Sequence, residues 1–130
     1  MGRKVFIGHS YGSLLGLQAL FTEPAMFDTY ILGSPSLWYG KHVMFEREKA
    51  YAANRKDLKT KVYLGVGSLE GARPGEDGMV GDMRQFAKLL ASRRYRRLRI
   101  ESRVFEGDDH FTVAPSIATR GLKWALPATT

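Results

Sequence analysis

The feature that most constrains this chain of 130 residues is the stretch 5–12 (VFIGHSYG), where an apolar run ends in Gly-His-Ser-Tyr-Gly. A helix-like segment follows at once, and the combination of strand, serine and helix is the pattern of a nucleophile elbow. In such a turn the serine adopts a strained backbone conformation that leaves its hydroxyl exposed. We expect glycine on both sides of Ser10, at Gly8 and Gly12, because side chains there would collide across so tight a turn.

The Gly-x-Ser-x-Gly string is weak evidence by itself, because a chain with 14 glycines also forms ordinary glycine-rich turns between strands and helices. Its surroundings carry more weight. A run typical of a β-strand precedes it, the apolar segment 13–21 follows it, and an acid and a histidine come later in the order that such sites use. The context therefore favours a reactive serine over a purely structural turn.

Strand-like and helix-like segments alternate along the rest of the chain. Strands are predicted at 5–8, 30–32, 62–66 and 98–105. In the last of them apolar and polar residues alternate, which predicts one solvent-exposed face or a position at the edge of the sheet. Helices are predicted at 13–21, 45–54 and 79–90, and from about Pro115 to Leu126. This order shows no internal repeat. It predicts one α/β domain, residues 1–130, with a parallel four-stranded sheet and right-handed crossovers.

The connections also predict which faces of the sheet are covered. Sequential crossovers place the first three helices on one face and leave only the last helix for the other. Gly16 is expected to let the first helix approach the sheet closely, and Asp82 to favour the first turn of the third helix. The run 5–7 suits a strand covered on both faces, yet no strand precedes it. One edge and part of one face would then be apolar and exposed, so we expect a homo-oligomer that associates through them.

Ligands of parallel α/β sheets bind at the carboxyl ends of the strands. Four segments are predicted to meet there: the turn at Ser10, the loop with Trp38 and Tyr39, the loop with Glu70 and the loop with His110. This convergence predicts a single site. Trp38 and Tyr39 are candidates for lining an acyl or aromatic pocket, although plain loop packing explains them equally well.

A serine hydroxyl is a poor nucleophile at neutral pH, and it needs a histidine to take its proton and an acid to orient that histidine. Ser10, Glu70 and His110 follow the chain order serine, acid, histidine of this fold class. His9 lies inside the elbow and points the wrong way, and His42 precedes the acid candidates, so His110 is the predicted base. Glu70 is the favoured acid because it lies nearest the end of its strand. The alternative acids are Glu76, Asp77, Asp108 and Asp109.

Composition excludes some classes of function. The chain has no cysteine, which excludes disulfides and thiolate chemistry, and we expect no metal or other cofactor. No apolar run is long enough to span a membrane, so no membrane partner is expected. Residues 1–4 are too short for a signal peptide before the first strand. We expect a cytoplasmic protein, or a periplasmic one if an N-terminal segment precedes Met1.

The net charge of +7 is concentrated in one segment, 93–103. Its cations are Arg93, Arg94, Arg96, Arg97, Arg99 and Arg103. Such a cluster attracts nucleic acid or an anionic substrate, but cations also suit the C-terminal end of a surface helix. No groove-reading motif, zinc-ligand set or aromatic RNA-binding signature accompanies the arginines. We therefore interpret the cluster as the basic end of a helix and expect no nucleic-acid partner, with a nucleic-acid binder kept as a minor alternative.

Several motifs together resemble a known family. They are Gly-His-Ser-Tyr-Gly at 8–12, Phe-Thr-Glu-Pro at 21–24, Phe-Asp at 27–28, Ser-Pro-Ser-Leu-Trp at 34–38, Gly-Ser-Leu-Glu at 67–70 and Gly-Asp-Asp-His at 107–110. The chain is similar in them to the esterase family of α/β-hydrolases, and most of all to its siderophore (enterobactin-type trilactone) esterase branch. The resemblance implies a serine esterase for carboxylic esters. It maps Ser10, Glu70 and His110 to nucleophile, acid and base, with a small-molecule ester as the partner.

The chain also departs from the family pattern. Ser13 stands where relatives usually carry a second glycine, which the start of a helix tolerates. The elbow strand, fifth of eight in α/β-hydrolases, is first here, so the chain looks like the C-terminal half of the fold. The backbone N–H of Tyr11 then remains as the oxyanion-hole donor, and losing a second such donor costs roughly 10²–10³ in rate. The alternative function is a truncated, weakly active or inactive hydrolase fragment that acts as an assembly domain.

Overall fold

The computed structural model describes residues 3–71 and 78–126. Its centre is a four-stranded parallel sheet in the order β1-β2-β3-β4. The strands are β1 (Val5–His9), β2 (Thr29–Gly33), β3 (Thr60–Gly67) and β4 (Leu98–Phe105). Because all four run the same way in chain order, their carboxyl ends lie at one end of the sheet. The predicted α/β fold is confirmed.

The connecting segments are helical. They are α1 (Tyr11–Thr22), η1 (Pro24–Met26), α2 (Tyr39–Asn54), η2 (Ser68–Glu70), α3 (Gly78–Ser92) and α4 (Val113–Ala125), where η marks a short 3₁₀ turn. Gly16 lets α1 approach the sheet as expected, since a Cβ there would lie 2.5 Å from the Phe6 ring and 2.8 Å from Leu32. No helix within the described ranges is long and apolar enough to cross a membrane.

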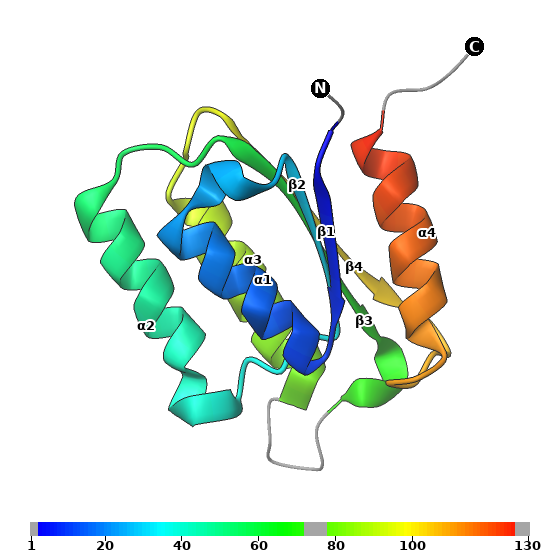
Figure 1. Ribbon diagram of the computed structural model, residues 1–130. Helices are drawn as coiled ribbons and strands as arrows, with labels where there is room; N and C mark the ends of the chain where they lie inside the picture. The colour runs from blue at the N-terminus through cyan, green and yellow to red at the C-terminus, as the bar shows by residue number, and fades with distance from the viewer. Residues whose placement is uncertain (1–2, 72–77, 127–130) are drawn as a thin grey trace.

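The molecule has three layers (Figure 1). Helices α1, α2 and α3 lie on one side of the sheet and α4 alone lies on the other, as the connections predicted. The core divides in the same way. The larger cluster, on the three-helix side, includes Leu17, Leu32 and Phe86, and the smaller one, under α4, includes Tyr63 and Ile117. Strands β2 and β3 are buried on both faces and form the centre of the sheet.

The expectation for Asp82 is wrong, and the start of α2 contains a kink that the sequence did not predict. No acidic residue lies in the first turn of α3; Asp82 is buried instead, with its carboxylate 3.3 Å from Nε2 of His42. Helix α2 spans Tyr39–Asn54, but Gly40, Lys41 and His42 in its first turn have non-helical φ of 61°, 55° and 63°, so the regular helix starts after His42, close to the predicted start at residue 45. A left-handed conformation is uncommon for residues with a side chain, so the apolar pattern carries no signal for this kink.

Strand β1 pairs only with β2, so its outer edge has no strand beside it within the described residues. It is not covered on both faces as its sequence suggested, because Ile7 is about half exposed. Beside this edge, Phe6, Leu15, Met26 and Phe27 contribute to an apolar hollow of about 360 Å³. An exposed apolar edge therefore exists, and association of copies through it stays a prediction that a mass measurement in solution at tens of micromolar tests.

The arginines of segment 93–103 do not form one helix end, which was the expected arrangement. Helix α3 ends at Ser92, and later arginines of the segment lie on β4. Arg93 binds Glu48, with Nη2 2.8 Å from Oε1, and Arg97 binds Asp57, with Nε 2.6 Å from Oδ2. Two guanidinium groups of β4 lie over aromatic rings, Arg99 over Trp124 and Arg103 over Phe105. Much of this positive charge is thus engaged within the chain itself.

Candidate active site

Ser10 lies between the last residue of β1 and the first residue of α1. Its backbone has φ 60° and ψ −122°, an uncommon conformation for a residue with a side chain that costs of order 1–3 kcal/mol. The surrounding hydrogen bonds hold this strain in place. The Ser10 N–H donates to the carbonyl of Gly33 at 2.8 Å, and the Ser13 hydroxyl donates to the same carbonyl at 2.7 Å. A strained serine at a strand–helix turn is the backbone geometry of a nucleophile elbow.

The two flanking glycines do not have the same reason to be glycine. A Cβ at Gly8 would lie 2.6 Å from the carbonyl oxygen of Gly12, a clash that the turn has no room to relieve. A Cβ at Gly12 would meet nothing within 4 Å. The expectation of a collision is therefore confirmed at Gly8 and wrong at Gly12, since the crowded side of the turn is the strand side.

Glu70 closes η2, directly after β3, and its side chain is only 3 % exposed. Three groups surround its carboxylate. The Ser34 hydroxyl donates to Oε2 at 2.7 Å, the Gly67 N–H donates to Oε2 at 2.8 Å, and Nδ1 of His110 lies 2.6 Å from Oε1. A carboxylate accepts hydrogen bonds only, so His110 presents its Nδ1–H to Glu70 and leaves Nε2 available as a base.

His110 lies in the turn between β4 and α4, and hydrogen bonds from two sides anchor this turn. From η2, the Ser68 hydroxyl accepts the N–H of Gly107 at 2.8 Å, and the N–H of Leu69 donates to the carbonyl of Asp108 at 3.0 Å. From β1, Nε2 of His9 lies 2.7 Å from the carbonyl oxygen of His110. The loop with the predicted base is therefore fixed to the two strands that carry the other predicted residues.

The Ser10 hydroxyl lies 3.3 Å from the Ser36 hydroxyl, and within the described residues this is its hydrogen bond rather than one to His110. Serine–histidine hydrogen bonds are often long in ligand-free sites and tighten when a substrate binds. Ser36 belongs to the loop after β2, which also contributes Ser34, so this loop touches both the serine and the acid of the site.

The rim of the site is aromatic. Tyr11, Trp38 and Tyr39 are each about half exposed, and their rings pack edge to face with centroids 5.7–6.3 Å apart. Phe111, next to His110, is largely exposed. The N–H of Tyr11 is in the first turn of α1, where backbone N–H groups have no acceptor within the helix and the helix dipole favours negative charge. The two predicted aromatics thus lie beside the elbow, together with the ring of Tyr11, a residue that the sequence singled out only for its backbone N–H.

The alternative acids are differently placed. Glu76 and Asp77 lie outside the described residues. Asp108 accepts the Thr112 hydroxyl at 3.1 Å. Asp109 accepts the N–H groups of Phe111 and Thr112 at 2.8 Å, and these bonds at the start of α4 lower the pKa of its carboxyl. Both aspartates are engaged in their own loop, whereas Glu70 faces His110.

Sequence reasoning missed three contributors. Ser34 and Ser36 were part of a motif without a role, and His9 was only rejected as a base. Nothing local marks Ser34, whose φ of 40° turns its hydroxyl toward a residue 36 positions later in the chain. The predicted strands could have placed Ser34 near Glu70, though not their hydrogen bond, because Ser34 directly follows β2 and Glu70 lies just after the neighbouring strand β3.

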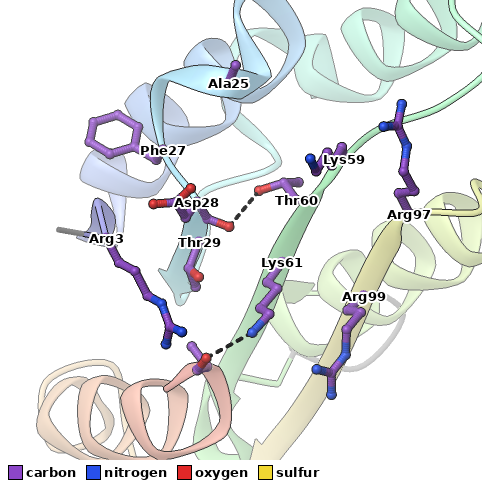
Figure 2. A pocket seen from close by; sticks show the side chains of 11 residues that line it. Arg3, Ala25, Phe27, Asp28, Thr29, Lys59, Thr60, Lys61, Arg97 and Arg99 are labelled. Atoms are coloured by element: carbon purple, nitrogen blue, oxygen red, sulfur yellow. Dashed lines mark hydrogen bonds between the residues drawn. The ribbon is translucent and has the colours of Figure 1, made fainter. Parts of the chain in front are cut away.

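A hollow of about 440 Å³ lies at the opposite end of the sheet, among the amino ends of the strands (Figure 2). Arg3, Lys59, Lys61 and Arg99 give it a positive character, and the Lys61 ammonium donates to the carbonyl of Ala125 at 3.0 Å. None of the predicted site residues contributes to it. Within the described residues, no group of three His, Asp or Glu side chains is arranged to hold a metal ion.

Comparisons with known proteins give close matches, although no family model matches the chain. The ferri-bacillibactin esterase BesA of Bacillus subtilis (strain 168) is 31% identical over 126 residues, which are 95% of this chain and 43% of that protein. The siderophore triacetylfusarinine C esterase of Aspergillus fumigatus is 31% identical over 144 residues, with 94% of this chain and 48% of that protein covered.

Solved structures agree with these sequence matches. The BES protein from Bacillus cereus is 30% identical and superposes with a TM-score of 0.80, over 95% of this chain and 45% of that one. The chain thus spans about half the length of the relatives that it matches, and nearly all of it is shared with them. By sequence and by fold, the chain is similar to siderophore esterases over nearly its whole length, and it has the fold of about half of an α/β-hydrolase-like protein of this kind.

Proposed function

We propose that this chain carries the acyl-transfer site of a serine esterase that hydrolyses carboxylic esters of siderophores. The observation that supports this most directly is the buried Glu70 carboxylate 2.6 Å from Nδ1 of His110, in a loop that is tied to the elbow strand. A histidine oriented in this way has one purpose in such a site, which is to move a proton at its other ring nitrogen.

The reaction proceeds in two halves. Ser10 Oγ attacks the ester carbonyl carbon while Nε2 of His110 takes the hydroxyl proton, and the resulting oxyanion accepts a hydrogen bond from the N–H of Tyr11. The tetrahedral intermediate collapses, the bond from carbon to the alcohol oxygen breaks, and His110 returns the proton to the leaving alcohol. A water molecule, deprotonated by His110, then attacks the acyl-enzyme and releases the acid with Ser10 restored. Glu70 stabilises the imidazolium in both halves.

The rim supports an aromatic substrate. Three exposed rings beside the elbow, those of Tyr11, Trp38 and Tyr39, offer faces and edges on which planar groups such as catechols stack. The relatives' names support siderophores as the substrate class, since both sequence relatives are siderophore esterases. We assign Trp38 and Tyr39 to substrate binding, and a trilactone with catechol groups is the first substrate to test.

A fluorophosphonate probe tests the nucleophile without a known substrate. Ser10 displaces fluoride from the probe and becomes phosphonylated, so the parent chain should be labelled and Ser10→Ala should not. Ser36→Ala is the matched control, because it removes the neighbouring hydroxyl 3.3 Å away and leaves the nucleophile in place. Mass spectrometry of the labelled peptide identifies the residue.

Two outcomes would contradict the proposal. One is the absence of labelling in parent protein that circular dichroism shows to be folded. The other is labelling that persists in Ser10→Ala and disappears in Ser36→Ala. A labelled chain that leaves catechol trilactones intact but cleaves simple aryl esters would retain the serine mechanism and remove the siderophore assignment.

A further inference from the structure

His9 is the residue directly before the nucleophile, and its ring faces the histidine that we assign as the base. Its Nε2 lies 2.7 Å from the backbone carbonyl oxygen of His110, and the two imidazole rings lie 4.7 Å apart, centroid to centroid, at 39°. The contact joins residues that are 101 positions apart in the chain. It links the strand that ends in the elbow to the turn that carries His110.

The geometry fixes the tautomer of His9. A carbonyl oxygen only accepts, so Nε2 of His9 must carry a proton and donate it. Nδ1 of His9 is buried, and within the described residues it has no hydrogen-bond partner. It lies above the backbone of Gly33, where an added Cβ would come within 3.1 Å of it. A bare lone pair is the less costly of the two states in such a place, because a buried N–H without an acceptor loses its full hydration.

We propose that His9 is a positioning residue for His110, and this inference rests on the proposed function. Its Nε2–H holds the carbonyl of His110 and thereby sets where the imidazole of His110 lies between Glu70 and Ser10. The other anchors of the turn, Ser68 and Leu69, form hydrogen bonds with Gly107 and Asp108, which precede His110 in the chain. Within the described residues, the His9 bond is the one that fixes the backbone of His110 from the side of the nucleophile.

The test separates the hydrogen bond from the ring. His9→Phe keeps an aromatic ring against His110 and loses the donor, whereas His9→Gln keeps an amide donor and loses the ring. His42→Gln is the matched control, a histidine change that leaves this turn untouched. We expect the maximal fluorophosphonate labelling rate to fall about tenfold in His9→Phe, the order of one hydrogen bond, and by less than about threefold in His9→Gln. The concentration of probe at half-maximal rate should stay unchanged.

Proton NMR supplies a readout that does not depend on activity. In protein with ¹⁵N-labelled histidine, the Nδ1–H of His110 that faces Glu70 should give a low-field proton signal, assigned by its loss in His110→Gln. We expect this signal in the parent, in His9→Gln and in His42→Gln, and its broadening or loss in His9→Phe. The ¹⁵N shifts of the parent should also show His9 with its proton on Nε2.

Each result decides the matter. Unchanged labelling and an unchanged low-field signal in His9→Phe overturn the inference, and so do equal losses in His9→Phe and His9→Gln. If neither variant folds, the tautomer in the parent decides, because a His9 with its proton on Nδ1 cannot donate to His110. A parent that shows the expected tautomer and signals but takes no label refutes the proposed function and leaves the positioning contact standing.

Discussion

Glu48 and Glu70 are both carboxylates that the fold removes from water, with side chains 0 % and 3 % exposed. Glu48, on α2, is held by Arg93, whose Nε and Nη2 donate to its two oxygens at 2.9 and 2.8 Å. Glu70 is held by Ser34, the Gly67 N–H and His110. One carboxylate faces a partner that keeps its proton at any ordinary pH, and the other faces a partner that can exchange one.

Under the proposed function, this difference separates a carboxylate that only stabilises the fold from one that takes part in catalysis. A guanidinium with two parallel hydrogen bonds fixes α2 against the end of α3 and offers no proton to a reaction. The bond to Glu48 raises the pKa of Arg93 further above its usual value. His110, by contrast, has Nδ1 hydrogen-bonded to the Glu70 carboxylate and Nε2 free of that bond. Its side chain is 31% exposed. Burial of a carboxylate is common to both, so it is the partner that distinguishes the two roles.

The largest expected effect is that of Glu70→Gln set against Glu48→Gln. A glutamine amide no longer holds His110 in the tautomer with Nε2 free, so the labelling rate of Ser10 should fall by about 10⁴. Glu48→Gln should label at the parental rate per folded molecule and lose stability instead. Two results would contradict the assigned roles. One is a loss of labelling in Glu48→Gln with a loss of stability alone in Glu70→Gln, and the other is a parental labelling rate in Glu70→Gln.

Arg93→Met should have the next largest effect, on stability alone. It leaves the Glu48 carboxylate buried without its cation, which costs about 3–5 kcal/mol for a fully buried pair. Because the Arg93 side chain is 30 % exposed, solvent screens part of this, and we expect a loss of about 2 kcal/mol in urea unfolding. Adding Glu48→Met should recover much of the loss, since no unpaired charge then remains. A double variant less stable than Arg93→Met would contradict this account.

Ser34→Ala should have a smaller effect that sharpens the comparison within the Glu70 site. It removes the hydroxyl that donates to Oε2 at 2.7 Å and keeps the Gly67 N–H and His110 in place. A hydrogen bond to a charged group is worth about 1.5–3 kcal/mol, and because the other two partners of the carboxylate remain we expect an effect at the low end of this range, a fall of about tenfold in the labelling rate. Ser102→Ala, at an exposed serine of β4, is the control. Equal losses in both variants would show that the bond from Ser34 to Glu70 does not matter for the labelling rate.

The fold and the placement of the three predicted site residues at one end of the sheet were accessible from the sequence for definite reasons. Buried parallel strands read as short apolar runs, and parallel order places all their carboxyl ends together, so Ser10, Glu70 and His110 were predicted to meet. The contacts that support them were not accessible. The bond from Ser34 to Glu70 depends on a left-handed φ of 40°, and the bond from His9 to His110 depends on a turn 101 residues later.

The same limit applies to the charged residues. Asp82 was expected to interact with a helix dipole, because sequence position gives its place on α3 but not its depth. In the structure Asp82 is buried beside His42. His42 lies in the kink of α2, where residues with side chains have positive φ. Helical periodicity describes faces and not side-chain partners, so the ion pairs of this molecule became visible only with its packing.

The smallest expected effect concerns a third carboxylate, Asp57, which is paired at the surface. Its oxygens accept the Arg97 Nε at 2.6 Å, the Arg97 N–H at 3.1 Å and the Leu58 N–H at 2.9 Å. The side-chain bond from Arg97 is the main reason that the pKa of Asp57 falls from 3.8 to about 2. The Arg97 side chain is 62 % exposed, so water and salt screen the pair.

The sign of its pH dependence follows from that shift. The folded state favours the ionised carboxyl, so Asp57 contributes stability above pH 3.8, and the contribution is lost as the pH falls toward about 2. The urea midpoints of the parent and Asp57→Asn should therefore converge over this range and stay apart above it. Arg97→Ala should keep part of the dependence, because the two backbone N–H donors remain. Parallel curves for the parent and Asp57→Asn would contradict the shift. Convergence would show that an ion pair in contact with water still makes the stability of the fold depend on pH.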